Sequence, residues 1–161
     1  WPYEAFYLAR LGSPEAVAAR RAQVVAAAQA AGLVLNHAAI QRVPNTRLAH
    51  RLLAAARPHL GAKALYALMD AVFAAYFVHG QDLGDAAVLA QLAHEHGVPE
   101  AALHAWRQDT AALDPHDSMG GSGAHGVPFV VFNERQAVSG AQVPSVWLSV
   151  MRQVLNLRAP A

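Results

Sequence analysis

Apolar side chains recur every three or four residues along most of the first 113 residues, a spacing that predicts helices. The pattern is strongest over residues 62–79, where the apolar positions are Leu65, Leu68, Met69, Val72, Phe73, Tyr76 and Phe77. Because this helix is the most hydrophobic of the series, we expect it to form the centre of a helical core.

Capping residues and prolines mark where the helices begin and end. Ser13 offers a side-chain oxygen to the free N–H groups of a first turn, and Pro14 is tolerated at the first helical position, so a helix begins there. The other signals are Gly32 as a C-terminal cap, a break at Pro44, Asn45 or Thr46 as an N-terminal cap, a stop near Arg57 before Pro58, and Asp85 as an N-terminal cap. Two more helices are expected, one ending at Gly97 and one over 98–113, with an extended or looped segment over 33–43.

The pattern changes after Leu113. Residues 114–126, DPHDSMGGSGAHG, contain too much Gly and Asp for a long helix. The run VPFVVF that follows is β-branched and aromatic and predicts a buried strand, NERQ predicts a polar turn, and AVSGA predicts a second strand. Pro144 then begins a closing amphipathic helix, so five or more helices are expected to precede a β-hairpin and a last helix.

The predicted hairpin poses a physical problem. A two-stranded hairpin is marginal in water, and the segment Phe129–Phe132 is apolar on both faces, which is typical of a strand with a neighbour on each side. The sequence offers one partner strand. Since the first residue is Trp1 and not Met, we expect that a leader was removed or that upstream residues are missing. An open strand edge also favours pairing with a second copy, hence a homodimer.

Composition excludes several classes of protein. Of the 161 residues 55% are hydrophobic and 14% charged, so the chain can bury a core and is not disordered. A net charge of +1 with scattered Arg residues gives no electrostatic case for nucleic acid. No apolar run approaches the roughly 20 residues of a membrane helix, and no signal peptide opens the chain, so no membrane partner is expected.

Several segments resemble one known family. GVPFVVFNERQAVSGAQ is similar to the C-terminal hairpin of DsbA-like thioredoxin-fold oxidoreductases, in particular of their cytoplasmic FrnE-type branch. LARLGSPEAV, QRVPNTRLAHRL and LMDAVFAAYFVHGQDLGDAAVLAQLAHEHG resemble, in the same order, the helical domain inserted in that branch. The resemblance implies an α/β, thioredoxin-like fold of the DsbA type, in which 1–113 form a large inserted helical domain and 114–161 the C-terminal part of the thioredoxin-like domain.

The same resemblance implies a cytoplasmic thiol–disulfide oxidoreductase that acts on protein or peptide thiols and disulfides without a cofactor. Pro128 matches the family's cis-proline, and Val127 before it matches the residue that holds the substrate; from the residues alone, an ordinary trans bond is favoured. The first strand–helix–strand unit of the family, with its Cys-x-x-Cys pair, has no counterpart here. The reaction needs a thiolate of lowered pKa, and because the chain contains no cysteine, none of its residues is expected to be catalytic.

Two alternatives stay open. PNTRLAH, residues 44–50, also resembles a motif of the glutathione-using hydroxychromene-carboxylate isomerases and kappa-class transferases, where the Asn that matches Asn45 lies near the thiol-binding cleft. Glutathione would then be the cofactor of an isomerase, whereas simple helix capping by Asn45 is the competing interpretation. The second alternative is a non-catalytic thioredoxin-like module that binds a partner beneath Pro128.

Nine histidines raise the question of a metal. His94 and His96 lie two apart on a predicted helix and so point to different faces, and His116 and His125 fall in the Gly-rich segment. Since a zinc site normally needs three or four converging ligands, no metal site is predicted.

Overall fold

The computed structural model describes residues 1–109 and 128–156. It divides into two compact units, Trp1–Ala111 and Ala112–Ala161. The expected boundary lies at 113/114. That the first unit is an insertion in a thioredoxin-like domain stays a prediction.

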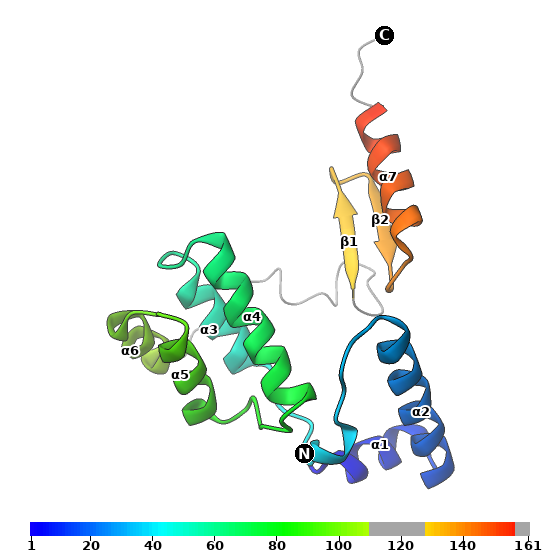
Figure 1. Ribbon diagram of the computed structural model, residues 1–161, viewed down its shortest axis with the longest axis horizontal. Helices are drawn as coiled ribbons and strands as arrows, with labels where there is room; N and C mark the ends of the chain where they lie inside the picture. Colours follow the sequence, from blue (N-terminus) through cyan, green and yellow to red (C-terminus); the bar gives the residue numbers. More distant parts are fainter. Residues whose placement is uncertain (110–127, 157–161) are drawn as a thin grey trace. The chain divides into compact units, whose positions relative to one another are not determined.

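The described part of the first unit is helical (Figure 1). Its elements are α1 (Tyr3–Leu11), α2 (Pro14–Ala30), the short 3-10 helix η1 (His37–Ala39), α3 (Arg47–Ala56), α4 (Ala62–Phe77), α5 (Ala86–Glu95) and α6 (Glu100–Gln108). The helices predicted from the sequence are confirmed, except that α6 ends at Gln108 and residues 110–113 lie outside the described residues. Helix α1 was not predicted, because its N-cap Pro2 makes no side-chain capping bond.

The predicted caps also form. The Ser13 hydroxyl accepts a hydrogen bond from the Ala16 N–H at 3.2 Å, and the Asp85 carboxylate accepts one from the Ala87 N–H at 2.8 Å. Gly32 follows the end of α2 with a φ of +71°, in the left-handed region that glycine tolerates best. Local sequence therefore determines where α2 and α5 begin and where α2 ends.

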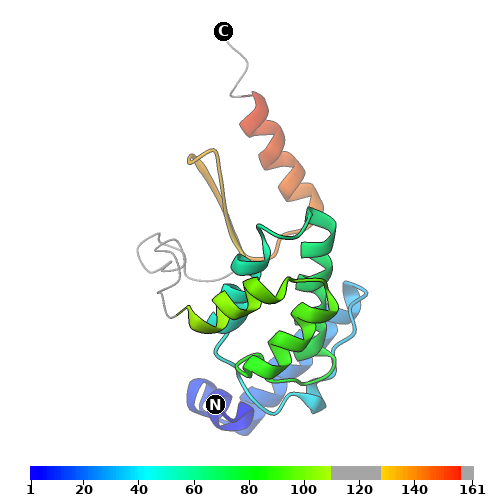
Figure 2. The ribbon, with the colours of Figure 1, turned by 90° about the vertical axis from the view of Figure 1, so that its left-hand side faces the viewer.

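The core of the first unit lies among α3, α4, α5 and α6, which are packed together (Figure 2). Leu52, Leu68 and Leu89 are completely buried there, and the Trp106 indole is buried with its Nε1–H donating to the Leu48 carbonyl at 3.1 Å. The complete burial of Leu68 confirms that α4 lies at the centre of this core. The expectation that the whole apolar stripe of α4 is core is wrong for Phe73, which is 58% exposed.

The second unit contains β1 (Phe129–Phe132), β2 (Gln136–Ser139) and α7 (Pro144–Asn156). The two strands pair antiparallel, with Phe129 opposite Ser139 and Phe132 opposite Gln136, so the predicted hairpin and closing helix are confirmed. The turn is closed by a hydrogen bond from the Arg135 N–H to the Phe132 carbonyl at 3.0 Å. Its residues Asn133 and Glu134 have φ values of +50° and +59°. Positive φ at both central residues is typical of a type I′ turn, whose twist matches that of the two flanking strands.

Helix α7 contacts the hairpin through Trp147, whose ring centroid lies 6.1 Å from the ring centroid of Phe132. The Trp147 indole N–H donates to the Gln142 carbonyl at 3.1 Å, which fixes the start of the helix. Among residues 128–156 the expected burial of both faces of β1 is not found, because Val130 is 37% and Val131 51% exposed.

None of the described helices is both long enough and apolar enough to cross a membrane.

Candidate functional site

The sequence predicts that Val127, Pro128 and Asn45 bind the substrate. Asn45 belongs to the first unit and Pro128 to the second. Val127 lies outside the described residues, so the geometry of the Val127–Pro128 bond stays a prediction.

Pro128 stands directly before β1 and extends the pairing of the hairpin by one residue. Its carbonyl oxygen accepts a hydrogen bond from the Gly140 N–H at 2.8 Å, next to the pair of Phe129 and Ser139. Gly140 has a φ of +78°, so the chain leaves β2 in a conformation that glycine adopts without strain. Pro128 is thereby held at the entry of the strand, and its side chain is exposed.

One edge of β1 is occupied by β2, and the described residues place no strand on its other edge. A strand edge presents alternating main-chain N–H and C=O groups that an extended peptide can pair with. The exposed Val130 and Val131 flank these groups. Chemically, this edge can therefore bind a peptide backbone with little dependence on its sequence.

Asn45 is exposed and caps α3. Its side-chain oxygen accepts a hydrogen bond from the Arg47 N–H at 3.1 Å, whereas Thr46, at the N-cap position, makes no side-chain capping bond. The capping interpretation of Asn45 thus has a hydrogen bond to support it. A role of Asn45 in thiol binding stays a prediction.

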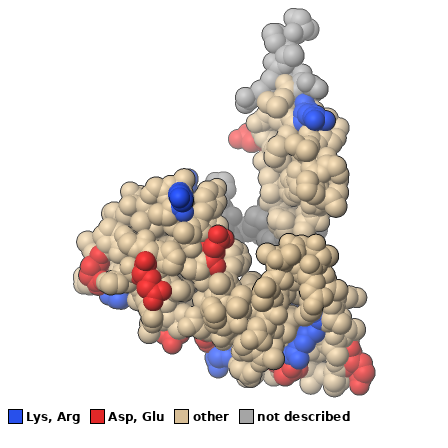
Figure 3. Space-filling model, viewed as in Figure 1, with Lys and Arg blue, Asp and Glu red and all other residues tan. Residues whose placement is uncertain are grey.

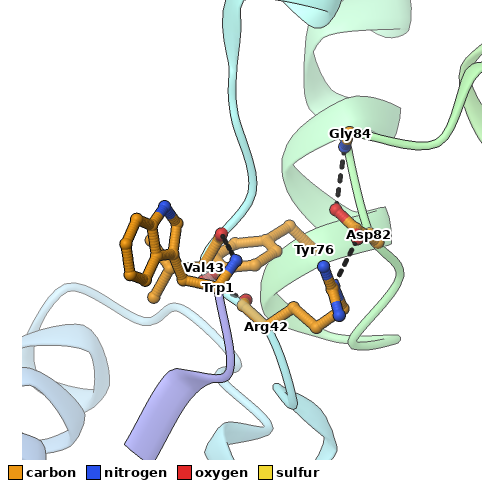
Figure 4. A network of polar contacts seen from close by, with 6 residues as sticks. All are labelled: Trp1, Arg42, Val43, Tyr76, Asp82 and Gly84. Atoms are coloured by element: carbon orange, nitrogen blue, oxygen red, sulfur yellow. Dashed lines mark hydrogen bonds and ion pairs between the residues drawn. The ribbon is translucent and has the colours of Figure 1, made fainter. Parts of the chain in front are cut away.

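The segment before Asn45 is fixed by a network of hydrogen bonds and an ion pair that no sequence pattern predicted (Figure 4). The Arg42 side chain reaches the loop after α4, where its Nε lies 2.8 Å from the Asp82 carboxylate. The other Asp82 oxygen accepts from the Gly84 N–H at 2.9 Å, which closes that loop. The Tyr76 hydroxyl donates to the Arg42 carbonyl at 3.1 Å, so the main chain of Arg42 is held as well.

On the side of the N-terminus, the main chain of Val43 pairs with Trp1. The Val43 N–H donates to the Trp1 carbonyl at 2.8 Å, and the terminal amino group of Trp1 donates to the Val43 carbonyl at 3.2 Å. No sequence signal pointed to these contacts, because their partners are about forty residues apart.

The network also affects the ionisation of its tyrosine. Burial first, and the neighbouring Tyr7, Tyr3 and Asp82 after it, raise the pKa of Tyr76 to about 12. The hydroxyl therefore keeps its proton at neutral pH and remains a hydrogen-bond donor to the Arg42 carbonyl. The network positions the main chain before Asn45.

The described residues contain no group of three or more side chains suited to a metal ion. His96 ends α5 with its Nδ1 2.8 Å from the Leu92 carbonyl, and His94 is exposed. His116 and His125 lie outside the described residues. On the face drawn in Figure 3, Lys and Arg stand singly and do not gather into a patch.

Comparison with known proteins identifies the family. The family model for DSBA-like thioredoxin domains matches residues 6–151, which is most of the chain. No curated protein matches the sequence.

Proposed function

We propose, from the premise that this chain belongs to the family of DSBA-like thioredoxin domains, that it serves thiol–disulfide exchange of the FrnE type. In this proposal the edge of β1 that begins at Pro128 binds the protein substrate, and the reaction takes place in the cytoplasm. The observation that carries the proposal is the position of Pro128 at the entry of a strand whose second edge has no partner among the described residues.

The chemistry assigns a restricted role to these residues. In disulfide exchange a thiolate attacks one sulfur of a disulfide, forms a mixed disulfide with it and releases the other sulfur as a thiolate. None of the 161 residues is a cysteine, so in this proposal the attacking thiolate belongs to a residue outside them. The described residues contribute the binding of the peptide on either side of the reacting disulfide.

Peptide binding is tested directly on the 161-residue chain. An extended peptide with an S-methylated cysteine is titrated into ¹⁵N-labelled protein, and the amide signals of Phe129–Phe132 are followed. Pro128→Thr should weaken binding by about tenfold, or about 1.4 kcal/mol, because it removes the ring that fixes the backbone where the edge begins. Pro144→Ala is the matched control, because this proline of the same unit begins α7.

A peptide that shifts none of these amides, or that loses equal affinity in both proline variants, contradicts the proposed binding edge. Catalysis is tested separately, on the protein isolated from its source under denaturing conditions. A mass well above 17.1 kDa together with titratable thiols is expected. A mass of 17.1 kDa without thiols would contradict the oxidoreductase hypothesis and favour a non-catalytic binding module.

A further inference from the structure

Helices α1 and α2 lie outside the continuous core of the first unit. That core extends from Ala49 to Trp106, and among the described residues it includes none from α1, α2 or η1. The buried apolar side chains of the N-terminal part form a smaller set of their own: Tyr3, Val17, Ala28 and Ile40. The attachment of α1 and α2 to the rest of the unit therefore depends on the segment around η1.

This segment, residues 36–43, is called the junction below. On one side it holds the start of α1, because the Tyr3 N–H donates a hydrogen bond to the Gln41 carbonyl at 2.9 Å. On the other side it is fixed to the end of α4 by the main chain, where the Asn36 N–H donates to the Phe77 carbonyl at 2.8 Å. A change within the junction can therefore release α1 and α2 while the core of the unit stays folded.

The imidazole of His37 lies in this junction. Both ring nitrogens are buried, and neither forms a hydrogen bond with any of the described residues. The ring meets the edge of the Tyr3 ring, with the two centroids 6.0 Å apart. A neutral imidazole in such a place lacks hydrogen bonds, whereas an imidazolium would in addition bury a charge without an acceptor for either N–H. The attached state therefore disfavours the protonated ring.

The charged group nearest to His37 acts in the same direction. The ionisable side chains that line a pocket of about 200 Å³ beside His37 are Tyr3 and Glu4 from α1 and Arg21 from α2. The Glu4 carboxylate is already paired with the Arg21 guanidinium, whose central carbon lies 4.9 Å from the centroid of the Tyr3 ring. Burial first, and the charge of Arg21 second, lower the pKa of His37.

We propose that His37 makes the attachment of α1 and α2 to the junction sensitive to pH, so that they detach several times more often in mildly acidic solution. Because both ring nitrogens are shielded from solvent, the imidazole takes up a proton when the ring leaves its place against Tyr3. Proton uptake and detachment are thus one event. This proposal does not depend on the function proposed for the hairpin.

The direction of the pH effect follows from the lowered pKa. In the detached state His37 has the ordinary pKa of about 6.5, so this state binds more protons than the attached one as the pH falls. Attachment is therefore strongest above about pH 6.5 and weakens below it. Since one proton is involved, the equilibrium constant for detachment rises at most tenfold per pH unit. Between about pH 7.5 and about pH 5.5 we expect a rise of about three- to tenfold.

Hydrogen exchange of the ¹⁵N-labelled 161-residue chain, followed by NMR, tests this proposal. The amides of Tyr3 and Val43 report on detachment, because they donate to the Gln41 and Trp1 carbonyls across the junction. Their protection factors, which are corrected for the effect of pH on the chemical exchange rate, should fall about three- to tenfold between about pH 7.5 and about pH 5.5. The protection of the α4 amides should stay the same, since that helix belongs to the core and contains no histidine.

Two substitutions locate the effect. His37→Phe keeps a ring against Tyr3 and cannot be protonated, so the protection of the Tyr3 amide should be the same at both pH values. His94→Gln removes an exposed imidazole from α5 and should keep the pH dependence of the wild type. Circular dichroism establishes that each variant is folded.

If His37→Phe does not fold, the wild-type ring decides the question. Its carbon–proton signals, assigned by their proximity to the Tyr3 ring, should be those of a neutral imidazole as long as the Tyr3 amide remains protected. An imidazolium signal in the protected state would overturn the proposal.

Two results of the exchange measurement would also overturn it. The first is protection of the Tyr3 and Val43 amides that is unchanged between the two pH values, or that changes equally in wild type and His37→Phe. The second is an equal fall in the protection of the α4 amides, which would mean that the unit opens as a whole and not at the junction.

Discussion

The two units differ in how much apolar surface their described parts bury. In the first unit four helices contribute to one continuous core that includes the fully buried Leu52, Leu68 and Leu89. Among residues 128–155 only Val138 and Val154 are buried. Large apolar side chains remain exposed there: Val130, Val131, Val143, Val146, Leu148, Met151 and Leu155.

This difference in burial predicts a difference in stability between the two units. A helical unit of this kind can be stabilised by its own core, whereas a hairpin with one helix buries too little to be stable without further packing. Leu148, Met151 and Leu155 lie three and four residues apart on α7, so they form one exposed apolar stripe. Stability of the second unit is therefore expected to depend on additional contacts, and the following predictions test this comparison.

The largest effect is expected from Trp106→Ala in the core of the helical unit. The substitution removes a side chain that is 2% exposed together with its hydrogen bond to Leu48, so the free energy of unfolding should fall by about 3–5 kcal/mol. Urea unfolding followed by circular dichroism measures this. Trp1→Ala is the control, since that indole is 76% exposed and should contribute little. Similar losses in both variants would contradict the assignment of the core.

A smaller effect is expected from Gly80→Ala, where the end of α4 meets η1. A Cβ at this position, which has a φ of +68°, would lie 2.1 Å from the Ala39 carbonyl oxygen. Left-handed strain and the clash together should cost about 2–4 kcal/mol. Gly12→Ala has the strain without the clash, because nothing lies within 4 Å, and should cost about 1–2 kcal/mol. Equal costs would mean that η1 does not pack against Gly80.

In the hairpin unit, Val138→Ala is expected to have a moderate effect. It removes two buried carbons, so the hairpin should lose about 1.5 kcal/mol. Hydrogen exchange of the β1 and β2 amides measures this, with Val131→Ala as the exposed control. Exchange in α3–α6 should be unchanged. If the helical amides lose protection equally, the two units unfold as one and the comparison between them fails.

The smallest effect is expected at the surface network of the first unit. Tyr76→Phe removes a hydrogen bond to the Arg42 carbonyl and should cost about 1 kcal/mol at pH 7. The raised pKa of Tyr76, about 12, means that the wild type loses stability from about pH 10 upward, as the unfolded tyrosine ionises and the folded one does not. The phenylalanine of the variant cannot ionise, so the stability gap between the two proteins should narrow between about pH 10 and about pH 12.

Urea unfolding at pH 7 and at several values above about pH 10 measures this gap. Tyr66→Phe on the same helix is the control, because that side chain is 65% exposed and forms no hydrogen bond of the network. A gap that stays constant with pH would contradict the raised pKa of Tyr76.

Much of the local structure was predictable from the sequence. Ser13 and Asp85 act through hydrogen bonds to N–H groups two or three residues away, so their effect is contained in the sequence nearby. The same holds for the β-branched run of β1 and for the turn after it. Helix α1 was missed because it has no such side-chain cap. Phe73 was misplaced because periodicity shows that α4 has apolar faces and does not show which of them the neighbouring helices cover.

The candidate site was predictable only in part. Pro128 and Asn45 were found because they belong to short motifs, and the motifs could not show that Asn45 caps α3. The ion pair of Arg42 and Asp82 joins residues forty positions apart, and ordinary charged residues at such a distance leave no pattern. The same is true of His37 and Arg21, which lie sixteen positions apart and line one pocket.

The sequence by itself determined the order and kind of most elements, the absence of any thiol among these residues, and the resemblance to DsbA-like thioredoxin domains, which the family match confirmed. These properties depend on composition and on interactions between residues close along the chain. The tertiary structure alone decided which apolar faces are buried, how the main chain before Asn45 is fixed, and that Tyr3, Glu4, Arg21 and His37 share a pocket. Such properties depend on contacts between distant residues, whose formation follows from packing the helices together and not from any local pattern.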